Sequence, residues 1–468
     1  MIRSILLGVF VSLTSFLYSQ GDKPNILYIL ADDLGYGDVG YMGQKIIETL
    51  NIDKLAQGGM VFNRHYSGST VCAPSRSSLL TGLHTGHTAI RGNKEIDPEG
   101  QEPLPAEAYT LAEMLQESGY TTGCFGKWGL GYPGSEGDPL NQGFDTFYGY
   151  NCQRQAHNYY PYHLWDNSEK IMLDGNIDSL ESTYAPSLIH SRALSFIENN
   201  DKKPFFLFYA TPLPHAELAA PDSLIDYYAK KIGKENAFQG VDRGPKYKNG
   251  GYGSQERPKA AFAAMVHLLD QQVGDLIAKL EEKGELKNTL IIFTSDNGPH
   301  KEGGAQPDYF DSNADLRGYK RDLYEGGIRV PSVAFYKGQI QAGSSSNHIS
   351  AFWDVMPTIA ELIGAPLPET DGISFLPELH GLEQPEHEYL YWEFHGRGGR
   401  QAILKDGFKW IKLQVNNPEK TTVELYNLNQ DPKEKNNIAS KNPELLKAME
   451  EIAVRAHQPS EIFPLAGD

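Results

Sequence analysis

The stretch Asn25-Ile-Leu-Tyr-Ile-Leu30 is almost entirely apolar, and the acidic pair Asp32-Asp33 follows it after a single alanine. Two further runs, Phe205–Tyr209 and Thr289–Thr294, are as short and nearly as apolar. Continuous runs of this kind predict strands that are buried on both faces. Between them lie segments with a helical period of apolar residues, of which 260–283 is the longest. Strands that alternate with helices predict an α/β fold, in which helices sandwich a large mixed, mostly parallel sheet.

Polar side chains follow each of the three predicted strands. Asp32 and Asp33 follow the first, His215 the second, and Asp296 and Asn297 the third. Ligands of such sheets gather at the carboxyl ends of the strands. Carboxylate and amide oxygens suit hard cations such as calcium or magnesium. The pattern therefore admits a metal site, and it equally admits acidic residues that only cap the turns or helices that follow.

The pattern changes near residue 380. Beyond it we predict four short strands separated by turns and then an amphipathic helix, at 389–394, 402–404, 408–413, 422–426 and 442–457. The chain is therefore expected to form a larger domain over 21–380 and a smaller C-terminal α+β domain over 381–468.

The net charge of the chain argues against nucleic acid as a partner. Its 468 residues include 42 Lys and Arg against 60 Asp and Glu, a formal net charge of −18. Binding to a phosphate backbone requires clustered basic residues.

The first 20 residues have the features of a secretory signal peptide. Arg3 precedes a mostly apolar stretch over 5–17, and the small residues Ser15 and Ser19 lie near the expected cleavage point. A membrane anchor is the alternative, but the stretch is shorter than the roughly 20 residues of a membrane-spanning helix. We expect a periplasmic or secreted protein without a membrane span.

Three cysteines exclude a disulfide scaffold. Cys72 stands close to Arg76, so it is either a reactive thiol of low pKa or a buried, inert one. Export permits a disulfide between Cys124 and Cys152, and the sequence does not decide whether they pair.

The segment Cys72-Ala-Pro74-Ser75-Arg76, followed by Leu80-Thr81-Gly82, resembles the signature of the type I sulfatases. In that family the cysteine is enzymatically oxidised to formylglycine. Five further segments resemble the family's motifs in order: Pro24-Asn25-Ile to Asp32-Asp33, Gly126-Lys127-Trp128-Gly129-Leu130-Gly131, Pro214-His215, Thr294-Ser295-Asp296-Asn297-Gly298, and Leu316 to Lys320 with Tyr324 to Pro331. The resemblance implies the alkaline-phosphatase-like fold with a small C-terminal domain.

The resemblance also implies roles by position. One calcium ion, rather than magnesium, would be held by Asp32, Asp33, Asp296, Asn297 and the formylglycine made from Cys72. Arg76 and Lys127 would hold and polarise the formylglycine. His215 and Lys320 would contact the sulfate and the leaving oxygen, with His215 as the general acid.

One position departs from the family's pattern. Gly129 stands where the motif commonly carries His, and we hypothesise that it opens space in the pocket. His157 and His300 are candidates for the missing role or for contact with substrate; otherwise they are ordinary histidines. Arg317 is expected to address sugar hydroxyls or a second sulfate.

The function implied is hydrolysis of a sulfate ester on a carbohydrate. The segment from Asp296 to Gly304, with Asp311-Ser-Asn313, resembles bacterial glycan sulfatases, which suggests galactose or N-acetylgalactosamine sulfate. The expected partners are a sulfated glycan and the enzyme that makes formylglycine. Two alternatives remain: a phosphate or phosphonate monoester hydrolase on the same fold, and a non-catalytic protein that binds sulfated glycans through an unconverted cysteine.

Overall fold

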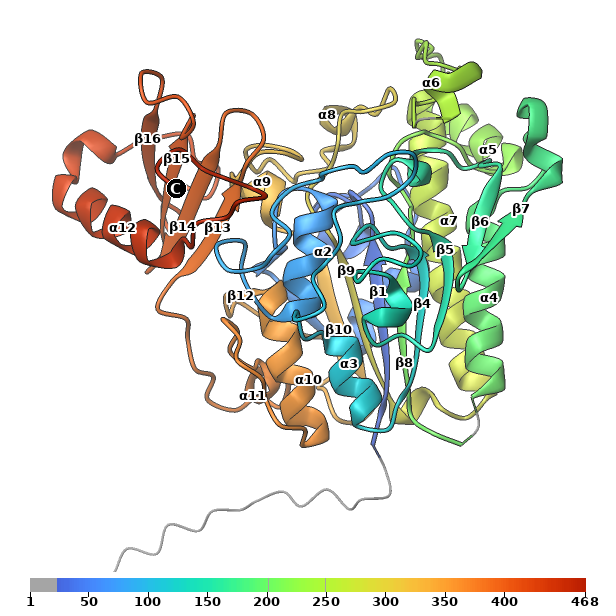
Figure 1. Ribbon diagram of the computed structural model, residues 1–468, viewed down its shortest axis with the longest axis horizontal. Coiled ribbons are helices and arrows are strands. Elements are labelled where there is room, and N and C mark those ends of the chain that lie inside the picture. The colour runs from blue at the N-terminus through green and yellow to red at the C-terminus, as the bar shows by residue number, and fades with distance from the viewer. Residues whose placement is uncertain (1–22, 201, 249) are drawn as a thin grey trace, which may run out of the picture.

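A ten-stranded sheet forms the centre of the computed structural model, which describes residues 23–200, 202–248 and 250–468 (Figure 1). The predicted strands are its central members β9, β1 and β8, which run parallel with β4 and β5. Antiparallel pairing continues the sheet on both sides, except that the last two strands at one edge pair in parallel. From one edge to the other the strands are β11 (Ser344–Ser346), β2 (Met60–Phe62), β10 (Ser332–Tyr336), β9 (Thr289–Ser295), β1 (Asn25–Ala31), β8 (Phe205–Ala210), β4 (Thr121–Lys127), β5 (Thr146–Tyr150), β6 (His163–Asp166) and β7 (Glu169–Met172).

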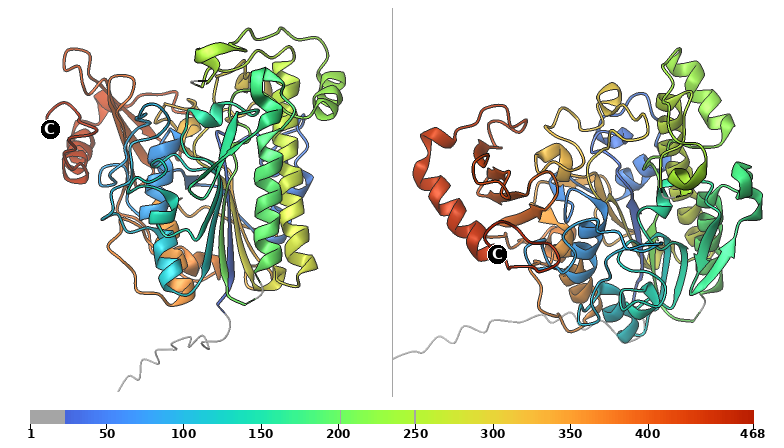
Figure 2. Two further views of the ribbon diagram at one scale, coloured as in Figure 1. Left: turned by 45° about the vertical axis from the view of Figure 1, so that its right-hand side comes forward. Right: turned by 45° about the horizontal axis from the view of Figure 1, so that its top comes forward.

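Helices cover both faces of this sheet, as predicted, and Figure 2 shows the sheet between them. One face packs against α1 (Leu50–Gly58), α4 (Ala185–Asn199) and α7 (Pro258–Glu282), and α5 (Asp222–Ile232) packs on α7. The other face packs against α2 (Cys72–Thr81), α3 (Leu111–Glu117) and α10 (Val355–Ile363). In β1, Leu27 and Ile29 enter the first core while Ile26, Tyr28 and Leu30 enter the second, which is why the run is apolar throughout.

A four-stranded antiparallel sheet follows near the carboxyl end of the chain (Figure 1). It consists of β13 (Leu390–Phe394), β14 (Arg400–Lys405), β15 (Phe408–Leu413) and β16 (Thr422–Asn427), and α12 (Pro443–Ala456) packs on one face of it through Met449 and Ile452. The other face packs against Tyr66 and Trp353 of the larger part. The predicted fold class is confirmed, while the domain boundaries at residues 20 and 380 remain predictions.

Short elements occupy the connections: β3 (His65–Tyr66), β12 (Ser350–Ala351), α6 (Gly244–Lys248), α8 (Pro307–Phe310), α9 (Glu325–Ile328) and α11 (Leu376–Leu379). The predicted signal peptide over 1–20 lies outside the described residues. Among the helices that the structure describes, none has the length and apolar character needed to cross a membrane.

Candidate active site

The ends of β1 and β9 bring four oxygen-bearing side chains together. The two strands pair in parallel with Ala31 opposite Ser295, so the residues that follow them meet at the same edge of the sheet. The backbone N–H of Asp33 donates to Oδ1 of Asp296 over 3.1 Å, and Nδ2 of Asn297 donates to Oδ1 of Asp33 over 2.7 Å. Asp32, Asp33, Asp296 and Asn297 are fully buried.

Each of the three carboxylates lies against a cation. Nζ of Lys127 is 2.6 Å from Oδ2 of Asp32, Nζ of Lys320 is 2.6 Å from Oδ2 of Asp33, and Nη2 of Arg76 is 2.8 Å from Oδ2 of Asp296. Burial raises the pKa of Asp32, but Lys127 and Arg76 outweigh it and lower that pKa to about 2. The pKa of Asp296 is raised to about 6 by burial and by the charge of Asp32. Each carboxylate of the cluster is thus paired with one buried cation.

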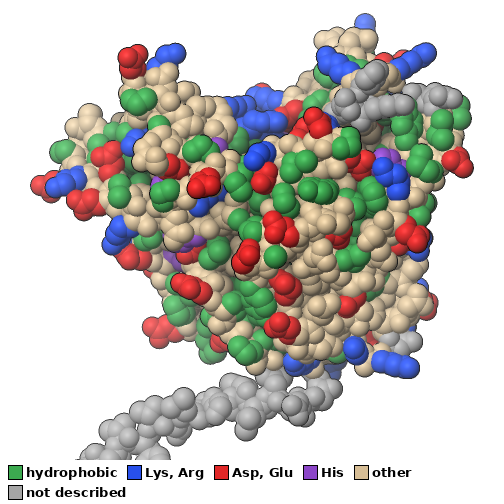
Figure 3. Space-filling model, viewed as in Figure 1, with side chains coloured by type: hydrophobic (Ala, Val, Ile, Leu, Met, Phe, Trp, Pro, Cys, Tyr) green, Lys and Arg blue, Asp and Glu red, His purple; other side chains and the backbone are tan. Residues whose placement is uncertain are grey.

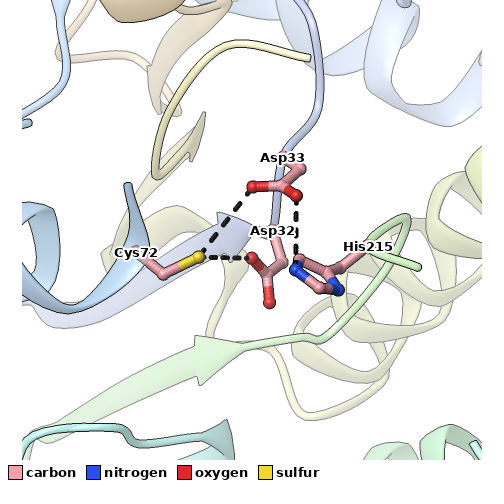
Figure 4. Close-up of side chains that lie close together, drawn as sticks. All are labelled: Asp32, Asp33, Cys72 and His215. Carbon is pink, nitrogen blue, oxygen red and sulfur yellow. Dashed lines mark hydrogen bonds and ion pairs between the residues drawn. The ribbon is translucent and has the colours of Figure 1, made fainter. Parts of the chain in front are cut away.

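Cys72 is the first residue of α2 and faces this centre (Figure 4). Its Sγ lies 3.3 Å from Oδ1 of Asp32 and 3.9 Å from Oδ1 of Asp33. Burial raises the pKa of the thiol well above its usual value, and the charges of Asp296 and Asp32 raise it further. The interpretation of Cys72 as a low-pKa thiol is therefore wrong. Cys124 and Cys152 are buried and do not pair with each other.

His215 approaches the same centre from beyond the end of β8. Its Nε2 lies 3.0 Å from Nζ of Lys320 and 3.4 Å from Oδ2 of Asp33, and its Nδ1 bonds to the carbonyl oxygen of Ala216. An ammonium group only donates, so Nε2 accepts from Lys320 and the ring proton lies on Nδ1. Burial lowers the pKa of His215 well below its usual value, and Lys320 and Lys127 lower it further, which keeps the ring neutral.

Two more histidines stack on the ring of His215. The His157 ring lies 5.0 Å away at an angle of 12°, and the His300 ring lies 5.6 Å away at 21°. Burial lowers the pKa of His157 to about 3. Burial also lowers the pKa of His300, but Glu302 and Asp33 outweigh it and raise that pKa. The structure thus brings both residues to the site, and their contact with substrate remains a prediction.

Arg317 is not brought to this cluster. One nitrogen, Nη1, donates to the hydroxyl of Tyr426 over 2.7 Å and to the carbonyl of Glu434 over 2.9 Å, and Nη2 donates to the hydroxyl of Tyr324. The chain turns at Gly318, where φ is 87°, before it reaches Lys320. The guanidinium of Arg317 therefore faces the C-terminal sheet.

The expectation that Gly129 opens space in the pocket is wrong. A Cβ atom at Gly129 would lie 1.9 Å from Nε2 of Gln153, so the side chain of Gln153 already fills that space. Sequence reasoning missed Gln153 because it belongs to none of the motifs. The missing histidine at residue 129 was the one available signal that another group lies there.

The strand-end residues have the chemistry of a site for a hard cation. Their side chains offer carboxylate and amide oxygens, and Oδ1 of Asn297 is buried without a hydrogen-bond partner. Ligand atoms of Asp32, Asp33, Cys72 and His215 all lie within 4.8 Å of one another. A cation here would give the Asn297 oxygen the partner that the protein does not provide.

An α/β sheet with a buried carboxylate cluster, ringed by cations and a neutral histidine at its strand ends, is the architecture of a hydrolase that acts on anionic esters. The family model "Sulfatase" matches residues 24–365, and the model "N-sulphoglucosamine sulphohydrolase, C-terminal" matches residues 317–458. The chain therefore belongs to the sulfatase family and is a sulfuric ester hydrolase.

Several characterised proteins are similar to it over most of their length. Human arylsulfatase A is 32% identical, with 83% of this chain and 73% of the relative covered. Rat N-acetylgalactosamine-6-sulfatase is 30% identical, with coverage of 83% and 72%. The crystal structure of Ps i-CgsB in complex with k-i-k-neocarrahexaose superposes with a TM-score of 0.78 at 29% identity, and it covers 93% of both chains.

Proposed function

We propose that the protein removes sulfate from a galactose or N-acetylgalactosamine unit of a sulfated glycan, using a formylglycine made from Cys72 and a bound calcium ion. The position of Cys72 carries this proposal, because a fully buried thiol of raised pKa lies 3.3 Å from Asp32 and makes a poor nucleophile as it stands. The relatives named for N-acetylgalactosamine 6-sulfate and for a complex with neocarrahexaose support a sugar substrate.

Oxidation of Cys72 to formylglycine would supply an aldehyde hydrate, with one hydroxyl to attack sulfur and a second to release the sulfate. Arg76 and Lys127 are placed to hold this group, since both lie in the cluster and Nη1 of Arg76 also bonds to the carbonyl of Lys127. That bond joins the second turn of α2 to the end of β4, so the two cations keep a fixed spacing.

Asp32, Asp33, Asp296 and the free Oδ1 of Asn297 would hold the calcium ion. Once bound, it would add positive charge where negative charge develops on the sulfate oxygens. Lys127 and Lys320 add to the same positive potential and limit the net negative charge of the cage.

The leaving sugar oxygen needs a proton, and we assign the donor to the pair of Lys320 and His215. In the resting state Nε2 of His215 accepts from the ammonium of Lys320 over 3.0 Å. The ammonium of Lys320 can give its proton to Nε2 of His215 and become a neutral amine, and the imidazolium so formed can donate that proton to the leaving oxygen and return to its neutral state. The rings of His157 and His300 both stack on that of His215 and help to hold it in place.

The test compares protein made with and without a formylglycine-generating enzyme. Mass spectrometry of the peptide that spans Cys72 should show conversion to formylglycine only with that enzyme. The converted protein should hydrolyse 4-nitrophenyl sulfate faster than 4-nitrophenyl phosphate, and Cys72→Ala should abolish the activity. Cys124→Ala is the matched control, because Cys124 is a buried thiol of the apolar core between the sheet and α2, α3 and α10, and no carboxylate of the cluster contacts it.

Two results would contradict the proposal. A preference for the phosphate ester would indicate a phosphomonoester hydrolase on this fold. An unmodified thiol at Cys72 in protein from its native host would favour a glycan-binding protein. Export, which residues 1–20 indicate, is tested separately by cell fractionation of the native host.

A further inference from the structure

The loop over 151–157 is attached to the catalytic cluster at both ends. At its start, the N–H of Gly129 donates to the carbonyl of Asn151 over 3.1 Å, two residues beyond Lys127. At its end, the ring of His157 stacks on that of His215. Side chains of this loop that point inward therefore lie along the edge of the site.

Two side chains of the loop carry buried amides without hydrogen-bond partners. Asn151 is 1% exposed and Gln153 is 3% exposed, and neither the oxygen nor the nitrogen of either side chain has a partner. Gln101, whose Oε1 accepts from the N–H of Gln153 over 3.1 Å, adds an unpaired Nε2. Buried polar groups are normally paired, so several orphans at one place require an explanation.

Two side chains of the same kinds and burial elsewhere in the described chain are paired at both the oxygen and the nitrogen. Asn176, also 1% exposed, donates to the carbonyls of Pro161 and Thr183 and accepts from the N–H of Thr183. Gln272, also 3% exposed, accepts from Tyr209 and donates to Pro186. Among the buried amides of the described residues, Asn151 and Gln153 lack partners for both the oxygen and the nitrogen, whereas Gln142 and Asn297 lack a partner for the oxygen alone.

The direction of these amides follows from their neighbours. Gln153 extends to Gly129, where φ is 81° and the missing side chain leaves room for it. In the same loop Cys152 and Arg154 line a different cavity, together with Glu99 and His163. Gln153 thus reaches the segment that follows β4 through its side chain, and Asn151 reaches it through its carbonyl, two residues beyond the Lys127 that contacts Asp32.

We propose that the amides of Asn151 and Gln153 bind uncharged polar substituents, a hydroxyl or an acetamido group, on the sugar ring whose sulfate is removed. This inference rests on the proposed function. A neutral amide both donates and accepts, as a hydroxyl does, whereas the charged sulfate is matched by Arg76, Lys127 and Lys320. A site built to pair with a hydroxyl discriminates strongly against substrates that lack it.

The test uses shape-conserving variants of the formylglycine-containing protein, Asn151→Leu and Gln153→Met. The substrates are monosulfated galactose and N-acetylgalactosamine, with 4-nitrophenyl sulfate as an ester that lacks the sugar ring. The readout is a specificity ratio: kcat/KM for the saccharide that the wild type cleaves fastest, divided by kcat/KM for the aryl ester. This ratio should be about tenfold or more lower in each variant than in the wild type. The Tm should stay level or rise, because each substitution removes an unpaired buried amide.

Asn176→Leu and Gln272→Met are the matched controls and should lower the Tm while the ratio stays unchanged. An unchanged specificity ratio in Asn151→Leu and Gln153→Met would overturn the proposed sugar subsite. The subsite would also be overturned if the wild type cleaved the aryl ester but none of the saccharides. Both results leave the sulfatase assignment intact. Failure to cleave any sulfate ester would instead overturn the proposed function.

Discussion

A single glycine decides what lies beside the end of β4. At Gly129 the backbone has φ of 81°, which side chains rarely adopt, and a Cβ atom would lie 1.9 Å from Nε2 of Gln153. The side chain of Gln153 thus depends on the absence of one at residue 129. A substitution at Gly129 would lower the free energy of unfolding through backbone strain and through the collision with Gln153. The two contributions can be measured separately.

We expect Gly129→Ala to lower the free energy of unfolding by roughly 2–4 kcal/mol, the sum of strain and collision. In a Gln153→Ala background the same substitution should cost less, because only the strain remains. Gly119→Ala is the control for strain alone, since φ is 90° there and no atom lies within 4 Å of the added Cβ. Equal costs for Gly129→Ala and Gly119→Ala would show that Gln153 does not occupy the space. Thermal or denaturant unfolding of the wild type, the three single variants and the double variant measures these costs.

Among the secondary-structure elements, β1 and β9 matter most for the chemistry. Their parallel pairing places Asp32 and Asp33 against Asp296 and Asn297. Neither strand alone supplies a complete set of oxygen ligands. A cation bound there would therefore connect the ends of two strands that are far apart in sequence.

Calcium should raise the Tm of the formylglycine-containing protein after treatment with a chelator, and magnesium should raise it less. At a free calcium concentration about 100-fold above Kd, binding adds about 2.7 kcal/mol to the stability of the folded state. Asp32→Asn should abolish the shift, whereas Asp138→Asn, which alters another buried aspartate, should retain it. A Tm that does not respond to calcium would exclude the proposed metal site. Differential scanning calorimetry provides the measurement.

Across the whole molecule, the C-terminal sheet is packed against the segments that carry the site (Figure 2). Trp392 of β13 donates through Nε1 to the carbonyl of Ser67 over 2.9 Å, five residues before Cys72. Glu393, the next residue, bonds to Arg91 over 2.9 Å and to His457 over 2.7 Å. On the face shown in Figure 3, Lys and Arg side chains gather in the hollow between the two parts, at the end where the strands carry the site. Both parts therefore border this basic hollow, which lies at the end of the sheet where we propose the catalytic centre.

The contacts of Glu393 predict how stability depends on pH. Burial raises the pKa of Glu393, but hydrogen bonds from His395 and His457 and the charge of Arg91 lower it from 4.5 to about 2. A carboxyl group whose pKa is lower in the folded state stabilises the fold above its unfolded pKa, and this contribution is lost as the pH falls from about 4.5 to about 2. The shift corresponds to about 3 kcal/mol.

Glu393→Gln should therefore destabilise the protein at pH 7, and its difference from the wild type should shrink as the pH falls below 4.5. Urea unfolding at several pH values measures this difference. Glu388→Gln on the exposed surface is the control and should show little change at any pH. A difference that stays constant between pH 7 and pH 3 would contradict the assigned cause.

Much of the architecture follows from local patterns in the chain. The apolar runs of β1, β8 and β9 predicted buried parallel strands, because a strand covered on both faces needs apolar residues on both sides. The rule that ligands meet at carboxyl strand ends then brought Asp32, His215 and Asp296 together before any contact was known. The motif around Cys72 indicated the family, and the family comparison confirmed it.

Other features depend on the paths of loops, which no periodicity describes. Arg317 lies three residues from Lys320, yet the turn at Gly318 separates them, so Lys320 reaches Asp33 and Arg317 contacts the C-terminal sheet. The stack of His157 on His215 and the filling of the Gly129 position by Gln153 join segments with no shared motif. Short stretches of sequence determine strand character and family membership. The groups around the candidate site are instead positioned by contacts between loops that are distant in sequence and that the folded sheet brings together.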